Sequence, residues 1–290
     1  MATDEAGQAD SGRGQHGWGK STFEDIYDQP DPRAYFTRLR PLRYQTPHHA
    51  QPVFRRLLDQ RARLNAPGNS VKVVDLCCSY GINAALVNHN LTLEDLYARY
   101  TGPKTAGLST PELIEADKEF YAVHRREQAV PFIGIDVAPR AVAYASAVGL
   151  LDGAFAENLE TGPASAKLAR AVAAAGLITI TGGVGYIGPR TFDTVLSHTR
   201  SPAWVAAFTL RMVDYRPIAD TLAARGLVTH TSPETYPQRR FTDDAEQQRA
   251  IARATATGHD PTGREANGYY HTLLHQSRPT TATGSRDRQP

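Results

Sequence analysis

Short apolar runs alternate along the chain with segments in which apolar residues recur at helical spacing. The apolar runs, which we expect to be β-strands, are residues 71–76, 130–136, 153–156, 177–181, 204–210, 227–231 and 269–275. Helical patterns cover residues 82–88, 139–147, 166–175 and 214–224, and glycines at 176 and 226 are expected to cap the last two. Strands that alternate with helices are typical of a parallel sheet covered by helices. The pattern therefore predicts an α/β fold.

The connection between the first two predicted strands is unusually long. Residues 88–129 separate them, whereas a simple crossover takes far fewer residues. Thr92 with Asp95 predicts one helix start in this connection, and Thr110 before Pro111 predicts another. We expect a helical insertion beside the carboxyl edge of the sheet. It would serve as a lid or as an interface, or it would have no functional role.

The ends of the chain differ in composition from its centre. We expect disordered tails at residues 1–20 and 280–290, because both are polar and contain few apolar residues. A helical cap segment is expected at residues 21–70. Residues 71–279 are then a single α/β domain, with the insertion at 88–129.

Composition and charge exclude several classes of protein. The 290 residues are 41% apolar, which is enough for a sizeable core, so a wholly disordered chain is excluded. Thirty-two basic and 30 acidic residues give a net charge of +2 without a basic cluster, so we expect no nucleic-acid partner. No apolar run is long enough to span a membrane, and no signal-like segment opens the chain, so a cytoplasmic protein is expected. The only two cysteines are adjacent, and we expect neither a disulfide scaffold nor a metal site.

The turn after the first predicted strand carries the main chemical signal. Asp75 ends the strand, and every second residue after it is small: Cys77, Ser79 and Gly81. Small residues let the backbone approach a ligand closely. The turn lacks the G-x-G-x-x-G glycines of a nicotinamide site, and its leading acid would repel a pyrophosphate but suit an ammonium group. The turn therefore favours a nucleotide that carries an amino acid.

This turn resembles the D/E-x-G-x-G-x-G signature of class I S-adenosylmethionine-dependent methyltransferases, with cysteine and serine in place of two glycines. The resemblance covers residues 71–278. It implies a doubly wound, seven-stranded Rossmann-like sheet that is mostly parallel, with an antiparallel last strand. It also implies S-adenosyl-L-methionine as cofactor, with S-adenosyl-L-homocysteine as its product, lying over the carboxyl ends of the first four strands.

The resemblance implies further cofactor contacts at the following strand ends. Asp136 would hold the ribose hydroxyls, although its distance in sequence from Asp75 is wider than is usual in the family. Glu157 and Asn158 would contact the adenine, and Thr181 with Gly182 would line the cofactor and the substrate.

Each of these residues also has a structural interpretation. Asp75 could form a turn, and Asp136 could cap the helix that starts at Pro139. Glu157 and Asn158 are ordinary loop residues by composition. A cysteine at position 77 is best explained as a small buried residue that replaces glycine.

The substrate side is predicted from residue types alone. Methyl transfer mainly requires an aligned nucleophile in a dry pocket, and a histidine base helps when the acceptor is a hydroxyl or a protonated amine. His48 and His49 before the first strand, and His271 in the last, are the candidate bases, with hydrogen-bonding loop residues as the alternative. Tyr44 and Tyr186 are expected to line the substrate.

The leading hypothesis is in-line methyl transfer to an oxygen or nitrogen atom of a small molecule. The chain is rich in arginine and alanine, and this composition suggests a bacterial gene and a role in secondary metabolism. The alternatives are a protein that binds the same cofactor without methyl transfer, such as a sensor or a cyclase, and a nicotinamide dehydrogenase. The oligomeric state, including a homodimer, stays open.

Overall fold

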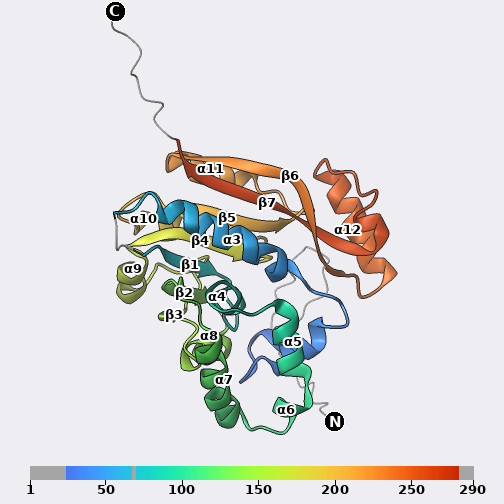
Figure 1. Cartoon of the computed structure of the whole chain (residues 1–290). Helices are drawn as coiled ribbons and strands as arrows, with labels where there is room; N and C mark the ends of the chain where they lie inside the picture. Colours follow the sequence, from blue (N-terminus) through green and yellow to red (C-terminus); the bar gives the residue numbers. More distant parts are fainter. Residues whose placement is uncertain (1–23, 67–69, 281–290) are drawn as a thin grey trace, which may run out of the picture.

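A computed structural model describes residues 24–66 and 70–280 (Figure 1). The predicted tails at residues 1–20 and 280–290 lie outside the described residues, apart from Thr280. The described residues form one seven-stranded sheet in the order β3-β2-β1-β4-β5-β7-β6. The strands are β1 (Lys72–Leu76), β2 (Phe132–Asp136), β3 (Gly153–Ala156), β4 (Ala175–Thr181), β5 (Trp204–Leu210), β6 (Leu227–Arg240) and β7 (Tyr269–Pro279).

The direction of the strands follows the expected pattern. Strands β1 to β5 pair in parallel, and β7 pairs antiparallel with both β5 and β6. The α/β class, the seven strands and the reversed last strand are therefore confirmed.

Helices precede the sheet and connect its strands. They are α1 (Glu24–Tyr27), α2 (Arg33–Leu39), α3 (Thr46–Ala62), α4 (Ile82–Asn88), α5 (Leu93–Thr101), α6 (Pro103–Ala106), α7 (Thr110–His124), α8 (Pro139–Ala147), α9 (Ala166–Val172), α10 (Pro189–Ser197), α11 (Arg216–Ala224) and α12 (Asp244–Ala256). None of those helices is long and apolar enough to cross a membrane.

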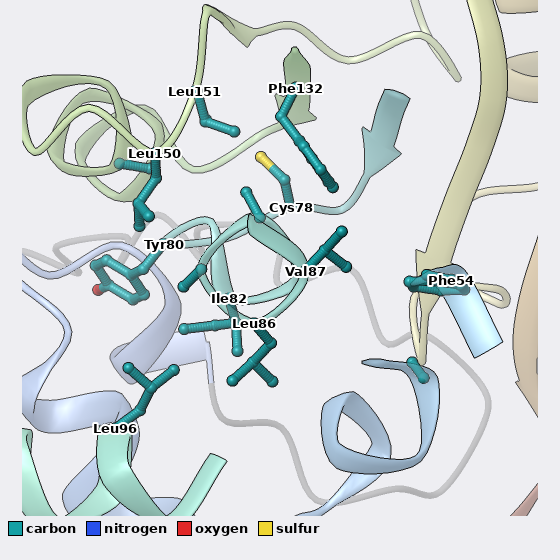
Figure 2. Close-up of a cluster of buried hydrophobic side chains, with 14 of the residues drawn as sticks. Phe54, Cys78, Tyr80, Ile82, Leu86, Val87, Leu96, Phe132, Leu150 and Leu151 are labelled. Atoms are coloured by element: carbon teal, nitrogen blue, oxygen red, sulfur yellow. The ribbon is translucent and has the colours of Figure 1, made fainter. Parts of the chain in front are cut away.

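Two apolar cores hold the layers together, one on each face of the sheet. Helices α3, α4 and α8 pack on one face, where Phe54, Leu86 and Phe132 are buried (Figure 2). Helices α9, α10 and α11 pack on the other face. Strand β5 is buried at every position because helices cover both of its faces, which explains why its sequence is a continuous apolar run.

The helical insertion is confirmed and consists of α5, α6 and α7. The carboxylate of Asp117, wholly buried in α7, forms an ion pair with Arg99 of α5. It also accepts hydrogen bonds from the hydroxyls of Tyr100 and Tyr144, and Tyr144 belongs to α8. The insertion is therefore fastened to the domain by a buried polar network.

Several predicted boundaries were wrong. Helix α9 ends at Val172, and Gly176 lies inside β4, where a Cβ atom would stand 2.9 Å from Val71 Cγ1. The glycine therefore permits close packing and does not cap a helix. Strand β6 continues to Arg240, well beyond the predicted end at residue 231, and its register shifts after Thr231 and after Pro237. It is an edge strand, largely accessible to solvent, so its sequence lacks the apolar alternation that predicts strands.

Candidate functional site

The strand order creates a switch point at β1. From β1 the chain adds β2 and β3 on one side and then returns to add β4 and β5 on the other. The loops that leave the carboxyl ends of neighbouring strands separate at such a point, and open α/β sheets bind ligands in the crevice that results. The carboxyl ends of β1, β2 and β4, together with the loops that follow them, carry eight of the fourteen predicted site residues.

The turn after β1 has an unusual backbone. Cys77, Ser79 and Gly81 have φ angles of 54°, 48° and 75°, so all three residues are in the left-handed region. This conformation suits glycine and costs other L-residues about 1–2 kcal/mol each. The turn thus has the backbone of a glycine-rich signature although two of its positions carry side chains.

Glycines on neighbouring elements make room for the two cysteines. A Cβ atom on Gly183, after β4, would lie 2.6 Å from Cys77 Sγ, and one on Gly134, in β2, would lie 2.7 Å from Cys78 Sγ. Figure 2 shows the Cys78 sulfur among apolar side chains that include Leu151. Burial raises the pKa of both thiols well above the usual value, which disfavours a thiolate nucleophile.

Asp75 is wholly buried at the end of β1. Its carboxylate accepts hydrogen bonds from Asn83 Nδ2 at 2.9 and 3.2 Å and from Thr179 Oγ1 at 2.7 Å. Burial raises the pKa of Asp75 to about 7, against the lowering effect of these hydrogen bonds. No cationic side chain among the described residues forms an ion pair with it. Because a buried carboxylate is stabilised by a nearby positive charge, a ligand ammonium group would favour its ionised form.

Asp136 connects the first two strand ends. Its Oδ2 accepts a hydrogen bond from the Ser79 amide at 2.8 Å, and its Oδ1 accepts one from the Ala138 amide at 3.0 Å. The hydrogen bond from the Ala138 amide, just before α8, agrees with the interpretation that Asp136 caps this helix. Each oxygen of Asp136 nevertheless keeps a further lone pair for a ligand hydroxyl. Val137, which follows, is 62% exposed. No sequence pattern singled out this exposed apolar side chain, and the only available signal was its place directly after the acid at a strand end.

Glu157 and Asn158 both have partners within the chain. Glu157 accepts hydrogen bonds from the amide and the hydroxyl of Ser165, the residue that caps α9. Asn158 Oδ1 accepts a hydrogen bond from the Glu160 amide at 3.0 Å. These contacts are the structural roles that composition suggested, and the adenine contact stays a prediction.

The loop after β4 meets the N-terminal helices. Gly182 has a φ of 74°, and a Cβ atom there would lie 3.1 Å from Gln238 Nε2 and 3.8 Å from the Tyr44 hydroxyl. Thr181 Oγ1 accepts a hydrogen bond from Asn83 at 3.1 Å, which ties this loop to the Asp75 group. Gln238, near the end of β6, was not predicted, because it lies in a polar stretch with no motif.

Aromatic side chains gather in the same region. Burial raises the pKa of Tyr44 to about 12. It also raises the pKa of Tyr27, with smaller contributions from the neighbouring hydroxyls of Tyr44 and Tyr186. Tyr186 is 48% exposed. The structure thus brings the two predicted tyrosines, 44 and 186, together with Tyr27.

The three candidate histidines differ in exposure and in hydrogen bonding. His48 is exposed on α3, whereas His49 Nε2 and His271 Nδ1 are buried without a hydrogen-bond partner. Burial lowers the pKa of each of these two histidines to about 4. Arg211, Arg264 and His49 lower the pKa of His271 further, since a charge on His49 would repel one on His271. Both buried histidines are therefore neutral at physiological pH.

Residues 26–29 lie across the loops that follow β1 and β2. The Tyr80 hydroxyl donates to the Ile26 carbonyl at 3.1 Å and accepts from the Gln29 amide at 2.9 Å. Asp28 Oδ1 accepts from the Arg140 amide at 2.7 Å, at the start of α8. We call residues 26–29 the strap.

Two other features carry no predicted site residue. A surface groove of about 570 Å³ is lined, within the described part of the chain, by Ala34, Thr37, Arg38, Pro41, Leu42 and Thr242. In that same part, no three His, Cys, Asp or Glu side chains gather as metal ligands would.

Comparisons with known proteins give structural similarity only. No family model matches the chain, and no curated protein sequence matches it. An S-adenosylmethionine-dependent methyltransferase from Geobacter sulfurreducens, solved with S-adenosyl-L-homocysteine, is 16% identical, with a TM-score of 0.37 over 82% of this chain and 94% of that one. Magnesium protoporphyrin IX methyltransferase from Synechocystis PCC 6803 is 11% identical, with a TM-score of 0.40 over 91% and 94%. The [4+2]-cyclase SpnF is 12% identical, with a TM-score of 0.37 over 78% and 81%.

These scores are too low to identify a function, and the strand order is the stronger observation. Five parallel strands are followed by an antiparallel β7 inserted between β5 and β6. The chain has the fold of the class I S-adenosylmethionine-dependent methyltransferases.

Proposed function

We propose that the chain binds S-adenosyl-L-methionine at the carboxyl ends of β1, β2 and β4 and transfers a methyl group to a small-molecule acceptor. The observation that carries the proposal is the left-handed backbone at Cys77, Ser79 and Gly81, directly after the buried Asp75. Such a backbone is costly for residues with side chains, and costly conformations cluster at ligand sites.

The residues present fit the three parts of this cofactor. The buried carboxylate of Asp75, which has only neutral hydrogen-bond donors, provides a negative potential for the ammonium group. Asp136 at the next strand end has lone pairs for ribose hydroxyls, and the exposed Val137 offers an apolar contact for the adenine ring. Ser79 Oγ is buried without a partner and adds a polar group in the same turn.

The bound cofactor supplies an electrophilic methyl group on a sulfonium. The residues of this chain contribute position and exclusion of water. The Tyr44 hydroxyl lies beside Gly182 at the end of β4, and the strap, which includes Tyr27, contacts the turn after β1 through Tyr80. A neutral histidine at position 49 or 271 is able to take a proton from the acceptor.

Calorimetry with S-adenosyl-L-homocysteine tests cofactor binding. The wild type should bind the nucleoside, and Asp136→Asn should bind it about ten- to a hundredfold more weakly, because a hydrogen bond to a charged group contributes about 1.5–3 kcal/mol. Asp193→Asn, a change at an exposed carboxylate paired with Arg225, is the control. Thermal protection by NAD but not by S-adenosyl-L-homocysteine would contradict the proposal.

Transfer of labelled methyl groups from S-adenosyl-L-methionine to a mixture of small metabolites tests the reaction. Labelled products should appear with the wild type and decrease with Asp136→Asn. Binding without any labelled product would instead favour a sensor or a non-methylating catalyst.

A further inference from the structure

Two buried polar atoms lie where the end of β6 meets the start of α3, and neither has a hydrogen-bond partner among the described residues. They are Gln238 Oε1, near the end of β6, and Thr46 Oγ1, at the first residue of α3. Gln238 is 1% exposed, and Thr46 is wholly buried. Buried polar groups are nearly always hydrogen-bonded, because leaving one without a partner costs free energy. The two atoms therefore indicate a site for a ligand or for ordered water.

Three side chains gather at Gly182, the residue that follows β4. A Cβ atom on Gly182 would lie 3.1 Å from Gln238 Nε2 and 3.8 Å from the Tyr44 hydroxyl. The Tyr44 hydroxyl also interacts with the side chain of Thr46. Between Tyr44 and Thr46 in the sequence, the Gln45 amide donates a hydrogen bond to the Gln238 carbonyl at 2.8 Å, which fixes β6 against α3. We call Gln238, Tyr44 and Thr46 the Gly182 group.

The Gly182 group adjoins the proposed cofactor site. Gly182 follows Thr181, whose hydroxyl accepts a hydrogen bond from Asn83 at 3.1 Å. Asn83 also donates at 2.9 Å to Asp75, which in the proposed function binds the ammonium group of the cofactor. The side chain of Thr181 interacts with the Tyr44 hydroxyl as well. A molecule held by this group would therefore lie next to the cofactor at the end of β4.

The polar side chains of the Gly182 group are neutral. The amide of Gln238 and the hydroxyl of Thr46 carry no charge, and burial raises the pKa of the Tyr44 hydroxyl to about 12. The neighbouring Arg239 is already paired with Glu246, at 2.7 Å. An ionised ligand group would lose its hydration here without gaining a free counter-charge. A cationic group would in addition be repelled by the sulfonium of the bound cofactor. The site therefore favours a neutral ligand group.

The amide of Gln238 selects the kind of neutral group. It places a donor, Nε2, beside an acceptor, Oε1, and neither forms a hydrogen bond with another described residue. A carboxamide or a lactam presents the complementary acceptor and donor side by side, so it pairs with both atoms at once. The rings of Tyr35 and Tyr44, whose centroids are 6.3 Å apart, provide apolar surface beside it. A ketone or an ether would satisfy only the donor.

We infer that Gln238 and Thr46 bind the methyl acceptor through a neutral carboxamide or lactam group. The inference rests on the proposed function and adds a substrate class to it. Gln238 determines specificity, because it pairs with both atoms of the ligand amide, and Thr46 contributes one further hydrogen bond.

Ligand-observed NMR on the full chain saturated with S-adenosyl-L-homocysteine tests this inference. The probes are benzamide, benzoate and benzamidine, which have the same shape but are neutral, anionic and cationic at pH 8. Acetophenone, which accepts hydrogen bonds but donates none, is a further probe. Benzamide should bind the wild type, whereas benzoate and benzamidine should not. Acetophenone should bind about tenfold more weakly than benzamide.

Variants of the two residues test their roles. Gln238→Met keeps the length of the side chain but removes its donor and acceptor. It should weaken benzamide binding about tenfold and leave the affinity for S-adenosyl-L-homocysteine unchanged. Gln238→Glu preserves the shape and adds a carboxylate that pairs with an amidinium, so benzamidine should become the preferred probe. This variant also serves if Gln238→Met fails to fold. Thr46→Val should weaken benzamide binding several-fold.

Gln60→Met is the matched control. Gln60 Oε1 is also buried without a partner among the described residues, but it belongs to the other end of α3, about 20 Å from Thr46 along the helix. The loss of a buried glutamine amide is thus reproduced away from the proposed site. Benzamide should bind Gln60→Met as it binds the wild type.

The outcomes separate the inference from the proposed function. If S-adenosyl-L-homocysteine does not bind the wild type, the proposed function fails. If the nucleoside binds but benzamide does not, or if the charged probes bind as well as benzamide, only the inference is overturned. The same holds if both Gln238 variants bind all probes like the wild type.

Discussion

The sulfur of Cys77 occupies the space that a side chain at Gly183 would need. A Cβ atom on Gly183 would lie 2.6 Å from Cys77 Sγ and 2.8 Å from Cys77 Cβ. Cys77 occupies a position at which the methyltransferase signature has a glycine. Its side chain fits because Gly183 has no Cβ atom. A substitution in one loop is thus accommodated by a small residue in the loop after the neighbouring strand.

This relationship predicts a coupled pair of substitutions. Gly183→Ala should destabilise the protein by about 2 kcal/mol, because overpacking a well-packed site costs about 1–3 kcal/mol. Adding Cys77→Gly should recover most of the loss. Chemical denaturation of the four proteins in the cycle measures the coupling. Gly107→Ala is the control, since no atom lies within 4 Å of the added carbon. Additive effects of the two changes would show that the contact is unimportant.

Asp75→Asn should change stability and cofactor affinity in opposite directions. The pKa of Asp75 is about 7 in the folded protein, above its ordinary value of 3.8, so folding favours the protonated form. The stability that this group contributes is therefore full below about pH 4 and is lost as the pH rises towards 7. An asparagine avoids this loss, and its oxygen can keep the hydrogen bonds from Thr179 and Asn83.

We expect the free Asp75→Asn protein to be more stable than the wild type by about 4 kcal/mol at pH 8 and about equally stable at pH 4. Its affinity for S-adenosyl-L-homocysteine should fall about tenfold, because the negative potential for the ammonium group is lost. Denaturation at both pH values and calorimetry at pH 8 measure these effects. An unchanged affinity would show that the carboxylate acts only within the fold.

Tyr80→Phe should loosen the strap. The change removes the hydroxyl that contacts Ile26 and Gln29 but keeps the buried ring. Because the strap crosses the loops after β1 and β2, S-adenosyl-L-homocysteine should dissociate several-fold faster in stopped-flow displacement. Tyr269→Phe, at a hydroxyl that contacts Arg240, is the matched control. Equal dissociation rates in the wild type and Tyr80→Phe would mean that the strap does not limit release.

The two buried histidines predict an unusual pH profile. Their pKa values of about 4 keep both neutral down to about pH 5, so turnover should not fall between pH 8 and 6, as it would with a base of ordinary pKa. The stability that they contribute is present above about pH 6.5 and is lost as the pH falls towards 4.

His49→Gln and His271→Gln should each lower turnover, and by about a hundredfold for the residue that acts as the base. The exposed His198, at the end of α10, provides the control variant His198→Gln. A loss at His48→Gln as large as at His49→Gln would contradict the assignment of the buried histidine.

The sequence by itself determined the order of the seven strands and the position of the turn after β1, but not the helices α10 and α12, for which it predicted no element. Buried parallel strands must be continuous apolar runs, and β5, which is buried at every position, has the predicted range at both ends. The turn could be located from its alternate small residues and its glycine, but its left-handed backbone at Cys77 and Ser79 could not, because residues with a Cβ atom rarely adopt that conformation.

Only the tertiary structure decided which residues face one another across the crevice. Gln238 and Gly182 are far apart in sequence and meet through the pairing of β6 with β7 and the docking of α3. Likewise, the sequence could not distinguish His48 from His49, because they are neighbours of the same type on one helix, and burial separates them. Local sequence carries local conformation, whereas side-chain environment depends on long-range packing that no short pattern encodes.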